Sequence, residues 1–114
     1  MLAVGAALCA LAVAAGAFGA HALQDSLDAR ALGQWETAAK YLMYAGLGAS
    51  IASCVEARGA GLALIFGGLV FAAAVGGLAI GGPRWLGAVA PLGGGSMIVG
   101  FGLLAWRAVN PKDG

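Results

Sequence analysis

The sequence predicts an all-α fold, a transmembrane four-helix up-down bundle with a short interfacial amphipathic helix between the first two spans. Three observations predict it. Of the 114 residues, 61% are hydrophobic and only 10% are charged, whereas soluble domains carry roughly 25% charged residues. Four apolar segments of membrane-spanning length follow one another between short polar stretches. An arginine and a tryptophan stand together at each end of the fourth segment, as is typical of the two membrane interfaces.

Each apolar segment has the length of a membrane span. About 20 residues of helix cross the roughly 30 Å hydrocarbon core, and backbone groups in lipid must be paired within their own segment, which favours helices. The first segment could also be a cleaved signal peptide, but no basic residue precedes Leu2, as a signal would require. We therefore predict one membrane domain, residues 1–114, with spans at about 2–22, 38–55, 60–80 and 86–106.

The longest polar stretch, about 24–37, separates the first two spans. Apolar residues recur there every four positions, which favours an amphipathic helix lying in the interface. Asp25 or Ser26 would cap its start, and an irregular polar loop is the alternative. The apolar positions are Leu23, Leu27, Ala31 and Trp35.

The remaining connections are short, so neighbouring spans should be antiparallel, with both termini on the same side of the membrane. That side and the other carry three basic residues each, so the positive-inside rule gives no orientation. The free amino terminus and the acidic first loop favour termini in the cytoplasm.

Small residues four positions apart predict the seams along which the spans pack, because lipid supplies no hydrophobic drive for helix association. Enlarging Gly16 or Gly76 to leucine should then push helices apart. The alternative is that the seams only reflect a composition rich in glycine and alanine. The predicted packing residues are Gly16, Ala20, Gly68, Ala72, Gly76, Ser96 and Gly100.

Several polar or unusual residues are candidates for function or for an interface. His21, the only histidine, closes the first span and could relay protons or simply end the helix. Thr37 is suited to a helix cap or to a hydrogen bond between helices. Trp35, Tyr41 and Tyr44 cluster, with Lys40, where the second span enters the bilayer; they suit an interfacial anchor, or contact with a headgroup or a quinone ring.

Pro91, followed by three glycines, is unusual within a span. The run fits either an unwound segment lining a transport path or a kink that serves packing.

The residues exclude several classes of site. Cys9, Cys54 and His21 fall at different depths, so we expect no metal site and no disulfide. No span holds paired carboxylates, no Ser/His/Asp grouping has plausible geometry, and no phosphate loop is followed by lysine, so we expect neither a cofactor nor enzymatic activity. A net charge of +1 excludes an extended nucleic-acid footprint.

Several motifs resemble one family in order along nearly the whole chain. They are Gly16 to Leu23 (GAFGAHAL), then Trp35, Thr37, Tyr41, Met43 and Tyr44, then Leu86-Gly87-Ala88 and Pro91 to Gly94 (PLGG). The chain is similar to the domain of unknown function four-two-three family of small bacterial inner-membrane proteins with four spans. The resemblance implies a multi-pass inner-membrane protein and brings no activity. Ala45 and the apolar run 71–76 depart from the family, whose members carry polar groups there.

Two functions from different classes follow, and a third, an enzyme acting on lipid or quinone, ranks last because catalytic groups are lacking. The first is a non-enzymatic accessory or structural subunit that packs, through its small-residue helix faces, with a larger membrane complex or with itself. The second is an oligomeric transporter of small molecules or ions. Beyond the lipid bilayer, the expected partners are other membrane subunits or further copies of the chain. The sequence names no activity, partner or ligand.

Overall fold

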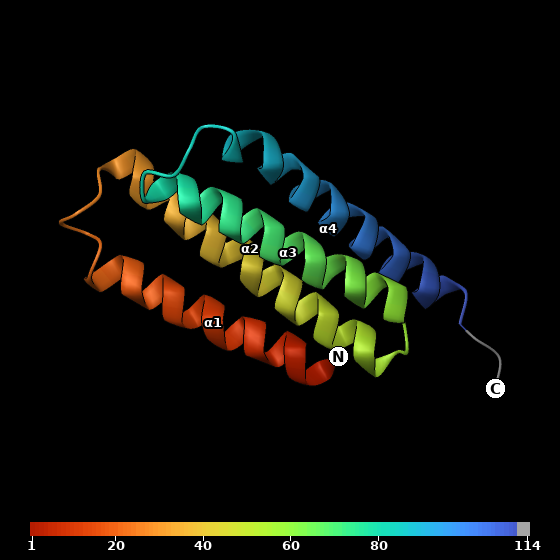
Figure 1. Ribbon diagram of the computed structural model, residues 1–114. Coiled ribbons are helices and arrows are strands. Elements are labelled where there is room, and N and C mark those ends of the chain that lie inside the picture. Colours follow the sequence, from red (N-terminus) through yellow and green to blue (C-terminus); the bar gives the residue numbers. More distant parts are fainter. Residues whose placement is uncertain (112–114) are drawn as a thin grey trace.

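Four α-helices make up most of residues 1–111, the part of the chain that the computed structural model describes (Figure 1). The all-helical fold is therefore confirmed, while the last three residues of the predicted domain lie outside the described part. The helices are α1 (Leu2–His21), α2 (Ala29–Cys54), α3 (Arg58–Ala79) and α4 (Leu86–Val109).

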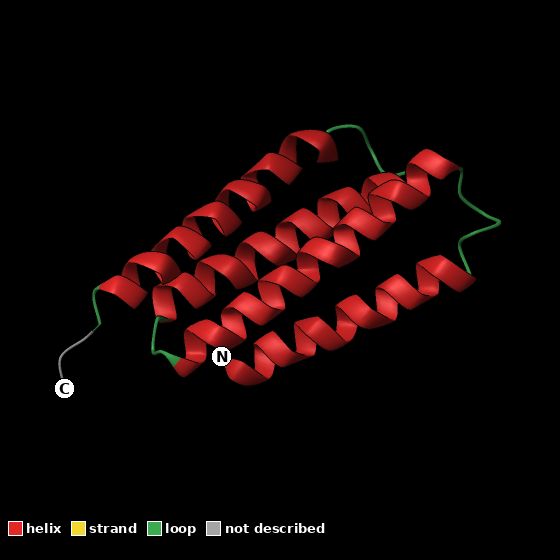
Figure 2. Cartoon of the chain, turned by 180° about the vertical axis from the view of Figure 1, so that it is seen from behind, coloured by secondary structure: helices red, strands yellow, loops and turns green. Residues whose placement is uncertain are grey.

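The helices lie in chain order, each packed antiparallel against the next (Figures 1 and 2). Among the described residues α1 and α4 do not pack on each other, and α2 touches α4 only slightly. The bundle is thus open rather than closed, and it measures 54 × 26 × 17 Å. As a result, α1 and α4 are edge helices, and α2 and α3 have a neighbour on each side.

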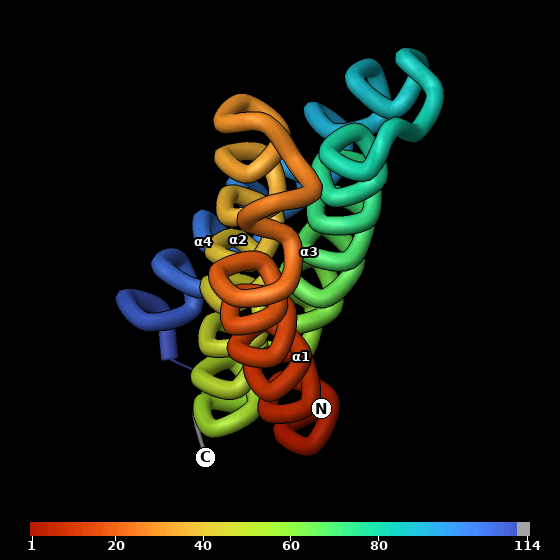
Figure 3. The backbone as a smooth tube through the Cα atoms, turned by 90° about the vertical axis from the view of Figure 1, so that its left-hand side faces the viewer, coloured from red at the N-terminus to blue at the C-terminus, as the bar shows by residue number. Residues whose placement is uncertain are grey.

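The amino terminus and the end of α4 lie at the same end of the array, as Figure 3 shows. Met1 also lines a hollow with Glu56, from the turn between α2 and α3, and with Arg58, the first residue of α3. The connections 22–28 and 80–85 lie at the opposite end (Figure 3). The array therefore has one end with both termini and one end with two loops, as the short connections predict.

The segment 24–37 does not form a helix of its own, which corrects that detail of the predicted fold. Residues 22–28 form turns, and α2 then runs without a break from Ala29 into the apolar segment. The cap is Asp28, not Asp25 or Ser26: its carboxylate accepts the backbone N–H of Ala31 at 2.8 Å. Because Asp28 satisfies this free N–H three residues on, the helix starts there.

Two helices end in the same hydrogen-bonded motif. At the end of α2 the N–H of Ala57 bonds the carbonyl of Ala52 at 2.8 Å, and Glu56 takes a φ of 56°. At the end of α3 the N–H of Gly82 bonds the carbonyl of Gly77 at 2.7 Å, and Gly81 takes a φ of 92°. Both are Schellman caps, in which a left-handed residue turns the chain out of the helix.

Glu56 occupies a left-handed position that glycine fills in the second cap. A left-handed conformation costs a residue with a Cβ about 1–2 kcal/mol. Replacing it by glycine removes this strain but costs about 0.5–1 kcal/mol of stability, because glycine loses more conformational freedom on folding. We expect Glu56→Gly to raise the melting temperature in mild detergent slightly, and Gly81→Ala to lower it. Equal responses to the two changes would show that the caps do not control these turns.

Glycines set the closest approaches between neighbouring helices. A Cβ on Gly46 would lie 2.7 Å from the carbonyl oxygen of Gly5 on α1. A Cβ on Gly93 would lie 2.5 Å from the backbone nitrogen of Phe71 and 2.8 Å from the carbonyl oxygen of Gly67 on α3. Backbone therefore packs on backbone at both crossings, as small residues allow in membrane helices.

The core around these crossings is small and rich in alanine. Leu64 is the largest fully buried side chain, and it packs with Ala45, Ala49 and Met97. Large apolar side chains lie mostly outside, on surfaces of all four helices. In soluble proteins most large apolar side chains lie inside, so their exposure here is typical of a protein that is surrounded by lipid.

Candidate functional surfaces

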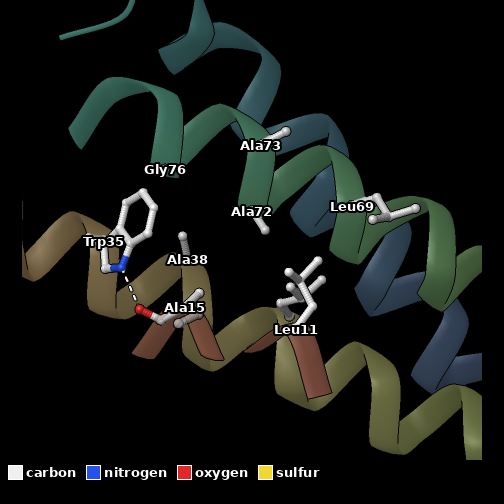
Figure 4. A pocket seen from close by; sticks show the side chains of 10 residues that line it. Leu11, Ala15, Trp35, Ala38, Leu69, Ala72, Ala73 and Gly76 are labelled. Atoms are coloured by element: carbon white, nitrogen blue, oxygen red, sulfur yellow. Dashed lines mark hydrogen bonds between the residues drawn. The ribbon is translucent and has the colours of Figure 1, made fainter. Parts of the chain in front are cut away.

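Trp35 lies in an apolar groove between α1 and α3, with α2 as its floor (Figure 4). Its Nε1–H donates to the carbonyl oxygen of Ala15 on α1 at 2.7 Å. Its ring packs near Phe18, with centroids 6.3 Å apart, and fills the space left by Gly19. Trp35 therefore links α1 to α2. The groove holds about 260 Å³ and is lined by Leu11, Ala15, Trp35, Ala38, Ala39, Leu42, Leu69, Ala72, Ala73 and Gly76.

Tyr41 and Tyr44 lie on a different side of α2, toward α4. Their rings meet edge to face with centroids 5.2 Å apart, and the ring of Tyr41 lies 4.8 Å from that of Phe71 on α3. The two tyrosines line a cleft with residues from the middle of α4. The predicted cluster of Trp35 with the tyrosines is therefore wrong: the structure places the tryptophan and the tyrosines in separate hollows.

The other candidate residues are scattered. His21 is exposed at the last position of α1, Lys40 is exposed on α2, and Thr37 is half-buried there. Pro91 is exposed inside α4, which stays helical through the following glycines. The structure therefore does not show the unwound segment that a transport path through this run would need.

Most of the predicted packing residues of α3 and α4 lie in helix interfaces. A Cβ on Gly68 would collide with that of Ala45, and Gly76 lies in ordinary contact with α2. Ala72 packs against the cluster of Leu8, Ala12 and Leu42. On α4, the Ser96 hydroxyl donates to the Ala63 carbonyl at 2.8 Å, and Gly100 packs on Leu64.

The predicted seam on α1 also runs through Ala12, where it is confirmed, but it is wrong at Gly16 and Ala20. A Cβ on Gly16 would meet nothing within 4 Å, and Ala20 is exposed. The buried positions of α1 are Gly5, Leu8, Ala12 and Gly19. The change Gly16→Leu should therefore leave the α1–α2 contact intact, because the seam runs along another stripe of the helix.

The sequence reasoning missed the glycines at the tightest crossings, Gly5, Gly46, Gly67 and Gly93. Two of them carry a signal that could have found them, since Gly5 precedes Cys9, and Gly46 precedes Ser50, by four positions. Such pairs of small residues mark contact faces in membrane helices. In the structure Gly46 faces Cys9, and Gly5 faces Ser50.

Cys9 and Cys54 are free thiols, the first half-buried and the second exposed. Among residues 1–111 no group of three or more His, Cys, Asp or Glu side chains is arranged to hold a metal ion. The two hollows beside Trp35 and beside the tyrosines offer mainly apolar contact and aromatic rings.

Three of the helices, α1, α3 and α4, are long and apolar enough to cross a membrane. Trp85 and Trp106, at the two ends of α4, are both more than half exposed, where indoles sit in membrane interfaces. The exposed surface is largely aliphatic and aromatic. These features define a small all-helical membrane protein.

The chain belongs to the family described as Protein of unknown function (DUF423), whose model matches residues 15–94. It is 38% identical over 97 residues to a UPF0382 membrane protein of Staphylococcus epidermidis, with 80% of each chain covered. It is 39% identical over 100 residues to UPF0382 membrane protein SSP2132 of Staphylococcus saprophyticus, covering 82% of this chain and 83% of the relative.

A more distant match has the same kind of name. The chain is 32% identical over 108 residues to UPF0382 membrane protein YwdK of Bacillus subtilis, with 88% of each chain covered. No solved structure matches the chain. The membrane location and the family predicted from the sequence motifs are thus confirmed, and the relatives' names add no activity.

Proposed function

We propose that all four helices cross the membrane, with α2 as the fourth span. It carries Arg30, Glu36 and Lys40 in its first half, which makes it the most polar helix. However, α1 and α3 pack on both sides of it, so lipid meets a narrower sector of α2 than of either edge helix. A helix with a neighbour on each side tolerates more polar residues than one surrounded by lipid.

We propose further that the protein is a non-enzymatic accessory or structural subunit that associates with other membrane helices, in a larger complex or with itself. The observation that carries this proposal is the outer face of α4. A Cβ on Gly87, Gly95 or Gly102 would meet nothing within 4 Å, so this edge helix presents glycines that no helix of the same chain uses. Exposed glycines let a second helix approach closely in lipid.

The variants Gly95→Leu and Gly102→Leu test this role. Neither should destabilise the fold, because both positions face open space. Each should reduce the fraction of protein that migrates above monomer size, on native gels and after cross-linking in membranes. The matched control is Gly16→Leu, an equally open glycine on the opposite edge helix. A wild-type protein that is monomeric in both measurements would contradict the proposal.

We propose the bacterial inner (cytoplasmic) membrane as the location, with both termini in the cytoplasm. The bacterial relatives, all named membrane proteins, support the membrane. The acidic connection between α1 and α2 would then face outward. The transporter alternative lacks comparable support, because α4 is continuous through Pro91.

A further inference from the structure

A cleft lies between α2 and α4, and the residues that line it differ in kind from those of the groove beside Trp35. It holds about 430 Å³, within the range of small-molecule sites. Aromatic rings, a thioether and two phenol groups surround it. The lining residues are Tyr41, Tyr44, Gly94, Met97, Ile98 and Phe101.

The cleft lies near the middle of the membrane-spanning array. Its α4 residues run from Gly94 to Phe101, and α4 itself runs from Leu86 to Val109. About eight residues of helix, or about 12 Å, therefore separate the cleft from each end of α4. Water and the ester groups of phospholipids lie near the ends of a span, so neither is the natural partner of a polar group in the cleft.

The two tyrosines that line this cleft carry hydroxyl groups without an acceptor. Tyr41 and Tyr44 are 39% and 44% exposed, and neither phenol has a hydrogen-bond partner among the described residues. Leaving a hydroxyl unpaired in an apolar medium costs free energy. An occupant with hydrogen-bond acceptors would remove this cost.

The extent of the cleft indicates a ring rather than a helix as that occupant. The lining covers one turn of α2 and two turns of α4, about 10 Å along the axis, whereas a docking helix would contact the full length of a span. The side chains that line it are aromatic or apolar, and they suit a flat ring held by stacking and edge contacts.

We propose that this cleft binds the head ring of a quinone-class lipid. The ring would lie among Tyr41, Tyr44 and Phe101, its two carbonyl oxygens would accept hydrogen bonds from the phenols, and its isoprenoid tail would leave into the bilayer. The proposal concerns binding alone and includes no electron transfer. It rests on the proposed membrane crossing of α2 but is independent of the subunit role, because no contact with another chain is needed.

The test uses the full chain in phosphatidylcholine nanodiscs with decylubiquinone as the probe, and binding is measured by equilibrium partition against empty nanodiscs. Decylbenzene, with the same chain and no carbonyl group, is the ligand control. We expect saturable binding of decylubiquinone only. Tyr41→Phe and Tyr44→Phe should each weaken it about fivefold, the equivalent of one hydrogen bond.

A matched protein control is Ser96→Ala, which removes a hydroxyl that α4 directs at α3 rather than into the cleft. It should bind decylubiquinone like the wild type. Three results would overturn the proposal: no saturable binding, equal binding of decylbenzene, or wild-type affinity in both tyrosine variants. A change in oligomer size in the tyrosine variants, without a change in affinity, would assign the cleft to a partner helix instead.

Discussion

Replacing Gly93 by alanine is expected to destabilise the protein strongly. The added methyl would lie 2.5 Å from the backbone nitrogen of Phe71, 2.8 Å from the carbonyl oxygen of Gly67 and 2.9 Å from the Cα of Phe71. All three are backbone atoms, which cannot move aside as a side chain can. Overpacking costs about 1–3 kcal/mol, and we expect the upper end. The measurement is the melting temperature in mild detergent, with unfolding monitored by intrinsic tryptophan fluorescence.

Gly95→Ala is the matched control on the same helix, two residues away. A methyl group there would meet nothing within 4 Å, and alanine favours helix over glycine by about 0.5–1 kcal/mol. The control should melt at or slightly above the wild-type temperature. If Gly93→Ala and Gly95→Ala had the same melting temperature, the backbones of α3 and α4 would not be in contact at Gly93.

Truncating Trp35 should produce the second large loss. In Trp35→Ala the hydrogen bond to the Ala15 carbonyl is lost, and so is the ring that fills the space beside Gly19. Large aromatic-to-alanine changes inside a core cost about 3–5 kcal/mol, and for the half-buried Trp35 we expect the lower end. Because α1 makes most of its helix contacts with α2, we expect α1 to detach first. Proteolysis of the connection 22–28 in mild detergent would then become faster.

Two further variants separate the contribution of the Trp35 ring from that of its hydrogen bond. Trp35→Phe keeps most of the ring and removes the donor, so it should lose about 1 kcal/mol. Trp85→Ala makes the same large truncation at a residue that is 63% exposed, and it should barely alter the protease sensitivity of the α1–α2 connection. Equal sensitivity of Trp35→Ala and Trp85→Ala would show that Trp35 does not hold α1 in place.

The sequence was sufficient for the fold class because span length and low charge are properties of whole segments. The start of α2 was not predictable in the same way. Its first turns are polar and its later turns apolar, so the change of composition predicts a boundary between two helices that the structure does not have. The backbone has no break there, since Asp28 caps the helix start and no proline or glycine pair follows before Tyr41.

That boundary also explains the error about the candidate site. In one continuous helix, Trp35 and Tyr41 are separated by six residues, or about 120° around the axis. The two rings must then face different neighbours, as the structure shows. Likewise, the four-residue spacing of Gly16 and Ala20 is real, but spacing alone does not say which stripe of α1 meets α2.

The four-span topology requires that α2 cross the membrane. Single cysteines at Asp25 and Pro83, at the loop end, and at Glu56 and Asn110, at the terminal end, can be placed in a chain with Cys9 and Cys54 changed to serine. They are then labelled with a membrane-impermeant maleimide in spheroplasts and in inverted vesicles. We predict that Asp25→Cys and Pro83→Cys are labelled from one side, and Glu56→Cys and Asn110→Cys from the other. Labelling of Asp25→Cys and Glu56→Cys from the same side would contradict the account.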